Sequence, residues 1–113
     1  MTVKILLERK FREDPSADEI KIINELRMAA MQRKGYISGE TLVDLNDYRR
    51  IVVISVWSNK RSWDAWENSE LRQKLESRIN ESLKQPPIIR VFMLGADYLG
   101  EVFEEVVHDS EVK

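Results

Sequence analysis

The side chains that most often carry chemistry in small proteins are scarce in this chain of 113 residues. Cysteine is absent, which excludes disulfides, thiolate catalysis and cysteine-ligated zinc or iron–sulfur sites. The single histidine, His108, argues against a His-rich metal site and against a Ser–His pair. Three tryptophans remain, and two of them, Trp63 and Trp66, stand at i and i+3, where helical residues share a face. Aromatic and charged side chains are therefore the candidates for any functional site.

Composition and charge restrict the class of protein further. Hydrophobic residues make up 42% of the chain and charged residues 34%, which is typical of one globular domain with a well-charged surface. The formal net charge of -2 argues against nucleic acid and anionic membranes as partners. No apolar run approaches the roughly 18 residues of a membrane span, and Met1 leads into a strand-like segment instead of a signal peptide. We therefore expect a cytoplasmic domain.

Four segments have the hydrophobic pattern of β-strands. The first alternates apolar residues such as Val3 and Ile5 with charged ones. The third is apolar on both faces, with Ile51, Val53 and Trp57 on one and valines and an isoleucine on the other, a pattern typical of a strand buried on both sides. The expected strands are Thr2–Phe11, Tyr36–Leu45, Arg50–Trp57 and Ile88–Leu94.

The two long connections between these strands have the apolar periodicity of α-helices. Ser16 and Glu19 have the spacing of a capping box, which predicts the start of the first helix. We expect this helix to carry Arg33 and Lys34 in its last turn and to end at Gly35.

The second helical segment is expected in two parts. A short helix begins after residues 58–59 and holds Trp63 and Trp66, and Asn68–Ser69 interrupts or re-caps it. A longer helix follows and stops before Pro86–Pro87. Its apolar stripe at i+4 spacing is expected at Leu71, Leu75, Ile79 and Leu83.

The resulting order is β-α-β-β-α-β, which predicts an α+β, ferredoxin-like fold with a four-stranded antiparallel sheet. Right-handed crossovers place both helices on one face of that sheet. The strands Arg50–Trp57 and Ile88–Leu94 are nevertheless apolar on both faces, and an uncovered apolar face is an association surface. We therefore expect a homodimer through the sheet face away from the helices.

The chain is expected to divide into a domain over residues 1–95 and an acidic extension over residues 96–113. The extension holds six acidic residues against Lys113 alone. It is either a solvated tail or a segment that docks on a basic surface of its own or a partner subunit. The amphipathic pattern of Asp97–His108 predicts a short helix within it.

The segment Val53–Ser69, VISVWSNKRSWDAWENS, resembles the antibiotic biosynthesis monooxygenase family of dimeric α+β barrels. In that family the third strand ends in an apolar–Trp pair, and a helix with W/F-x-x-W-x-x-S spacing then enters the ligand cleft. The resemblance covers residues 2–94 and leaves the acidic extension outside. The family includes haem-degrading enzymes, cofactor-free monooxygenases of aromatic polyketides and quinols, and members without assigned substrates.

The resemblance implies a set of ligand-binding residues. Trp66 matches the cleft tryptophan of the family. A cofactor-free monooxygenase needs an apolar, aromatic-lined cavity with one or two cations or donors directed at a substrate oxyanion. The candidates are Trp66 and Trp63 as walls, Tyr36 as wall or donor, and Arg9 or Arg27 as the positive partner.

Each candidate also has a purely structural interpretation. Trp63 and Trp66 are typical core residues at this spacing, as Trp57 is at the end of a buried strand. Arg9 can be an edge or interface charge on its strand, and Arg27 a solvated residue on the flank of its helix.

The haem-degrading branch is a poor match. It has an Asn on the first strand, where this chain has Glu8, and an iron-ligating His where this chain has Glu76. Glu8 is a weak candidate for a general base. We therefore expect no haem, no metal and no organic cofactor.

Three functions stay open at this point. The first is a cofactor-independent monooxygenase or related oxidoreductase acting on a small aromatic molecule. The second is a non-catalytic ligand-binding or regulatory protein on the same fold. The third is an enzyme whose cleft performs other chemistry, such as isomerisation or decarboxylation.

Overall fold

The computed structural model describes residues 1–100 and confirms the ferredoxin-like α+β fold. The four strands form one antiparallel sheet in the order β2-β3-β1-β4, so the first and third strands are central. The elements are β1 (Val3–Lys10), α1 (Ala17–Met31), β2 (Tyr36–Asp44), β3 (Asp47–Trp57), α2 (Lys60–Glu67), α3 (Glu70–Ile79), the 3₁₀ turn η1 (Asn80–Ser82) and β4 (Ile88–Met93).

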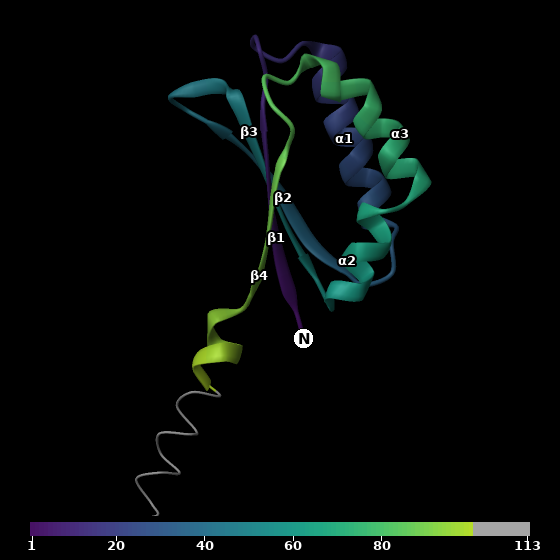
Figure 1. The fold of residues 1–113 in the computed structure, drawn as a ribbon, viewed down its shortest axis with the longest axis vertical. Helices are drawn as coiled ribbons and strands as arrows, with labels where there is room; N and C mark the ends of the chain where they lie inside the picture. Colours follow the sequence, from purple (N-terminus) through teal and green to yellow (C-terminus); the bar gives the residue numbers. More distant parts are fainter. Residues whose placement is uncertain (101–113) are drawn as a thin grey trace, which may run out of the picture.

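All three α-helices in this list lie on one side of the sheet (Figure 1). The register pairs Val3 with Trp57 and Leu7 with Val53, so the odd-numbered residues of β1 and β3 share the face beneath the helices. The main core lies between these layers. It includes Ile5, Phe11, Ile22, Leu26, Ile51, Trp57, Trp63, Trp66, Leu75 and Ile79.

The opposite face of the sheet, which we call the open face, is apolar along the centre of the two middle strands. Leu6 lies opposite Ile54, and Val52 and Val56 flank Ile54 along β3. These four side chains are half-buried within the chain. No helix of the described residues 1–100 covers them (Figure 1).

Helix α1 begins as expected and ends earlier than expected. Ser16 and Glu19 form the capping box, with the Ser16 hydroxyl accepting from the Glu19 backbone N–H at 3.2 Å. The helix stops at Met31. Arg33 and Lys34 therefore lie beyond its last turn, and the expectation that they belong to that turn is wrong. Gly35 then takes a φ of +90°, the left-handed conformation that glycine adopts without strain, and turns the chain into β2.

Of the apolar stripe predicted for α3, Leu75 and Ile79 are buried as expected, and Leu83 is buried just after the helix ends. Ser69 caps its N-terminus and accepts from the Arg72 backbone N–H at 3.2 Å, which starts a new helix instead of continuing α2. Leu71 is 49% exposed, so its predicted place in the apolar stripe is wrong. Its neighbour Arg72 is buried instead, together with Leu75, Glu76 and Ile79.

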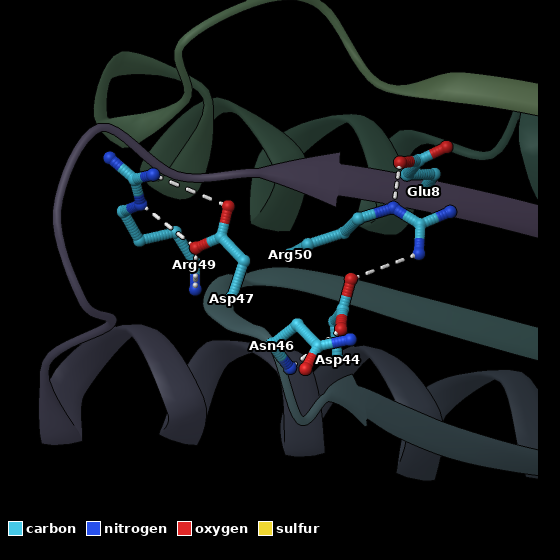
Figure 2. Close-up of polar contacts among 6 residues, drawn as sticks. All are labelled: Glu8, Asp44, Asn46, Asp47, Arg49 and Arg50. Carbon is cyan, nitrogen blue, oxygen red and sulfur yellow. Dashed lines mark hydrogen bonds and ion pairs between the residues drawn. The ribbon is translucent and has the colours of Figure 1, made fainter.

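Charged side chains tie the β2–β3 hairpin together (Figure 2). Arg50 on β3 pairs with Glu8 on β1 and, at 3.4 Å, with Asp44 at the end of β2. Arg49 donates to both carboxylate oxygens of Asp47, and this hydrogen bonding lowers the pKa of Asp47 below its ordinary value. These contacts fix the hairpin end of the sheet.

The chain after β4 turns helical over residues 95–100. The remainder of the predicted helix Asp97–His108, and most of the acidic extension, lie outside the described residues. Within the described part of the chain, no helix is long and apolar enough to cross a membrane.

Candidate functional site

A cavity of about 60 Å³ lies between the helices and the sheet. Side chains from β1, β2, β3 and all three α-helices line it. A volume of about 10–15 Å³ by this kind of measure holds one water molecule, so the cavity has room for several waters or one small polar group. The five residues that the sequence singled out for binding all line it: Arg9, Arg27, Tyr36, Trp63 and Trp66.

Aromatic rings form one wall of the cavity. Trp57, expected as a core residue, is fully buried and also lines the cavity. Its ring meets Tyr36 edge-to-face at 5.3 Å between centroids and Trp63 at 5.8 Å. The Trp57 indole N–H donates to the Ser55 hydroxyl at 3.0 Å, so its polar atom is satisfied. Trp63 and Trp66 belong to the core as well as to the cavity wall.

Two glycines allow the aromatic wall to pack closely. A Cβ on Gly39 would lie 2.4 Å from the Tyr36 hydroxyl, so only glycine leaves room for that ring to lie along β2. A Cβ on Gly35 would lie 2.3 Å from the Ser62 Oγ in the first turn of α2. Gly35 thus sets how closely α2, which carries Trp63 and Trp66, approaches the turn before β2.

A buried cluster of three charges forms the polar end of the cavity. Arg9 on β1 donates to a carboxylate oxygen of Glu76 on α3, and the same oxygen lies 3.4 Å from the Arg72 guanidinium. Arg9 is 3% exposed and Glu76 is 7% exposed. The cluster carries two guanidinium groups and one carboxylate, so it has one excess positive charge. Arg9 is therefore an interior residue on a central strand, and its interpretation as an edge charge is wrong.

Arginine side chains hold both tryptophans of α2. The Arg72 guanidinium carbon lies 5.6 Å from the centre of the Trp63 ring, within cation–π range. Arg33 lies 5.8 Å from the centre of the Trp66 ring and donates to the Ala65 carbonyl at 3.4 Å. Burial lowers the pKa of Arg72 below its ordinary value, while the Glu76 carboxylate acts in the opposite direction. Arginine keeps its charge at physiological pH under such a shift.

The remaining charged candidates lie elsewhere. Arg27 on α1 lines the cavity, yet its side chain is largely exposed, so it reaches the cavity from the solvent side. Glu8 projects to the open face, where it pairs with Arg50, and does not line the cavity. A role for Glu8 as a base in this cavity is therefore wrong.

Sequence reasoning missed two residues of the site, Arg72 and Glu76. The available signal was their spacing, because residues 72, 75, 76 and 79 form one i, i+3, i+4, i+7 face of a helix. Two opposite charges within such a face predict a buried pair with a partner elsewhere. Counting the stripe from Leu71 included an exposed residue at the flank of this face and left out Arg72 and Glu76.

The arrangement suits an aromatic molecule that carries a polar group. Its ring would pack against Trp63, Trp66 and Tyr36. Its polar group would face the excess positive charge of the cluster, and guanidinium groups in a site shielded from water stabilise a developing oxyanion. Residues 1–100 hold no cluster of histidine and carboxylate side chains suited to a metal ion.

A family model matches most of the chain. Residues 2–86 match the family model described as antibiotic biosynthesis monooxygenase. Among curated protein sequences, none matches the chain.

Solved structures share the fold at low sequence identity. One described as an antibiotic biosynthesis monooxygenase is 17% identical, with 81% of this chain and 97% of that one covered at a TM-score of 0.75. A conserved protein from Methanosarcina mazei Go1 is 12% identical, with 81% and 91% covered at 0.75. SnoaB, a cofactor-independent oxygenase from Streptomyces nogalater, is 11% identical, with 82% and 92% covered at 0.74. At such identities the likeness shows the fold alone.

Proposed function

The chain belongs to the antibiotic biosynthesis monooxygenase family, and on that premise we propose that it is a cofactor-independent monooxygenase. The substrate is a small aromatic molecule, of quinol or polyketide-like type, whose ring widens the cavity beside Trp66 as it binds, because the volume of about 60 Å³ is smaller than one ring needs. The observation that carries this proposal is the cavity itself, which combines aromatic walls with a buried cluster of excess positive charge. The similarity in fold to a cofactor-independent oxygenase supports it.

The chemistry that this site supports begins with the substrate anion. An electron-rich phenol or quinol that loses its proton to solvent becomes the reductant, and molecular oxygen is the oxidant. One oxygen atom enters the substrate and the other leaves as water, with the substrate supplying both the electrons and the protons. The protein lowers the barrier by stabilising the substrate oxyanion through Arg9, with Arg27 as a second cation at the solvent side. Trp63 and Trp66 hold the ring in place.

We propose that the working unit is a homodimer formed through the open face. Leu6, Val52, Ile54 and Val56 lie together there and are already half-buried, so burying the rest of each contributes about half of the roughly 1.5–3 kcal/mol that full burial gives. Their sum is still a large fraction of the total stability of a small domain, about 5–15 kcal/mol. A second copy whose open face packs against this one would remove these side chains from water. Localisation in the cytoplasm remains part of the same proposal.

The second candidate is a non-catalytic ligand-binding or regulatory protein on the same fold. Glu76 favours this candidate, because its carboxylate is engaged in an ion pair with Arg9 and lies close to Arg72, an arrangement that a purely structural charge cluster also has.

Oxygen uptake separates the two candidates. Purified protein is supplied with hydroquinone, a dihydroxynaphthalene or anthrone, in the presence of a metal chelator and without added flavin. A monooxygenase consumes oxygen in proportion to substrate and above the rate of spontaneous oxidation. A binding protein perturbs tryptophan fluorescence with the same compounds and leaves the rate of oxygen loss unchanged.

A further inference from the structure

Two polar atoms of the Arg9–Glu76 pair have no hydrogen-bond partner within residues 1–100. They are the Nε of Arg9 and the second carboxylate oxygen, Oε2, of Glu76. Both side chains are more than nine-tenths buried, and both line the cavity. A buried polar atom without a partner is costly, more so in a charged group, so such atoms are rare in folded proteins.

The two atoms have complementary requirements. The Nε–H of Arg9 is a donor and needs an acceptor, whereas the Glu76 Oε2 is an acceptor and needs a donor. They belong to the two ends of one ion pair, so a single small group that is both donor and acceptor can serve them together. A hydroxyl group is the smallest group on an aromatic ring that does so.

We propose that Arg9 and Glu76 form a hydroxyl-binding subsite at the polar end of the cavity. The phenolic oxygen of the ligand accepts from Arg9 Nε, and its hydrogen is donated to Glu76 Oε2. This inference rests on the proposed function insofar as the ligand is aromatic and occupies the same cavity. It adds that the ligand is recognised as the neutral phenol, before any proton is lost.

Other polar groups satisfy only half of the subsite. A ketone or an ether accepts from Arg9 and leaves Glu76 Oε2 without a donor. A carboxylate does the same and adds repulsion from Glu76. An ammonium group donates to Glu76 and leaves Arg9 without an acceptor, beside a cluster that already has excess positive charge.

Arg72 is a positioning residue for this subsite. Its guanidinium lies 3.4 Å from Oε1 of Glu76, the oxygen that Arg9 also binds. Both arginines therefore hold the carboxylate by one oxygen, and Oε2 stays available to a ligand. Arg72 also donates to the Glu67 carbonyl at 3.2 Å and stacks on Trp63, so the cluster and the aromatic wall are fixed to each other.

Equilibrium binding of phenol, anisole and benzoate to the full chain tests the subsite without requiring turnover. These compounds share a single ring and so need the least widening of the cavity, whose volume of about 60 Å³ is below the roughly 150 Å³ that holds benzene in an engineered protein. Binding is followed by tryptophan fluorescence and by calorimetry. We expect phenol to bind at least tenfold more tightly than anisole or benzoate, a ratio that corresponds to about 1.4 kcal/mol.

Variants then assign the preference to Glu76. Glu76→Gln keeps the shape of the side chain, but its one remaining oxygen faces the arginines, so the preference for phenol over anisole should largely disappear. Glu25→Gln, on the exposed surface of α1, is the matched control and should retain it. Equal binding of phenol and anisole to the wild-type protein, or binding of neither, overturns the proposal whether or not Glu76→Gln folds. A clear phenol preference without oxygen uptake would contradict only the proposed oxygenase activity.

Discussion

Replacing Glu76 by glutamine should destabilise the protein by about 3–5 kcal/mol, the usual cost of removing one partner of a buried ion pair. The substitution preserves side-chain volume, so the loss contains little contribution from a new cavity. It leaves the Arg9 and Arg72 guanidinium groups buried without a counter-charge. A loss of this size is a large fraction of the total stability of about 5–15 kcal/mol that is typical of a domain.

Urea unfolding measures this loss, provided that the protein concentration is the same in every sample. With a urea dependence of about 1–3 kcal/mol per molar, the midpoint should fall by on the order of 2 M. Glu25→Gln makes the matched control, because Glu25 pairs with Arg78 at 3.1 Å on the surface. An exposed pair of this kind contributes less than about 1 kcal/mol, so the control should stay near the wild-type midpoint.

The double variant Arg9→Met/Glu76→Gln identifies the source of the loss. If the loss comes from buried guanidinium groups without a counter-charge, removing one of the two should recover part of the stability. Equal midpoints for Glu76→Gln and Glu25→Gln would refute the reasoning, since they would mean that the pair is not shielded from water.

Three further predictions concern the wall of the cavity, its supporting turn and the open face. Trp57→Ala should lower the free energy of unfolding by about 3–5 kcal/mol. Trp66→Ala should weaken binding of an aromatic ligand more than it lowers the free energy of unfolding. If both variants lose similar stability and Trp66→Ala leaves binding unchanged, Trp66 has a purely structural role. Gly35→Ala should destabilise because of its φ of +90° and the 2.3 Å approach to Ser62, and thermal unfolding at or above the wild-type midpoint would show that the turn relaxes freely. The unfolding midpoint of the wild-type protein should rise with protein concentration, as expected for a dimer. Ile54→Asp should sediment as a monomer. A stable wild-type monomer near 13 kDa at micromolar concentration would contradict the dimer.

The strand pattern and the fold could be predicted because they depend on local sequence. The alternation along β1, the apolar run of β3 and the capping box at Ser16 each have a local physical cause, and each is found in the structure. The end of α1 was placed too late, because Arg33 and Lys34 are compatible with a last helical turn and only the turn at Gly35 excludes them.

The polar half of the site could be predicted only in part. Arg9 could be selected as a cation on the first strand, but its burial depends on Glu76, which lies 67 residues away in the sequence. No local pattern reports a contact of that separation. On α3, Leu75 and Ile79 are buried as predicted, but the buried face extends on the side of Arg72 and Glu76, and Leu71 lies exposed at its other flank. The aromatic wall could be predicted because tryptophan is highly buried on average.

Substrate-dependent oxygen uptake, compared between the wild-type protein and Trp66→Ala in the presence of chelator and without flavin, tests the central claim most directly. The proposed function predicts that the wild-type protein accelerates oxygen loss with a quinol or anthrone substrate and that Trp66→Ala, at matched folded concentration, loses most of that acceleration. Uptake at the spontaneous rate with wild-type protein, or undiminished uptake with Trp66→Ala, would contradict the claim that the cavity beside Trp66 carries out the oxidation.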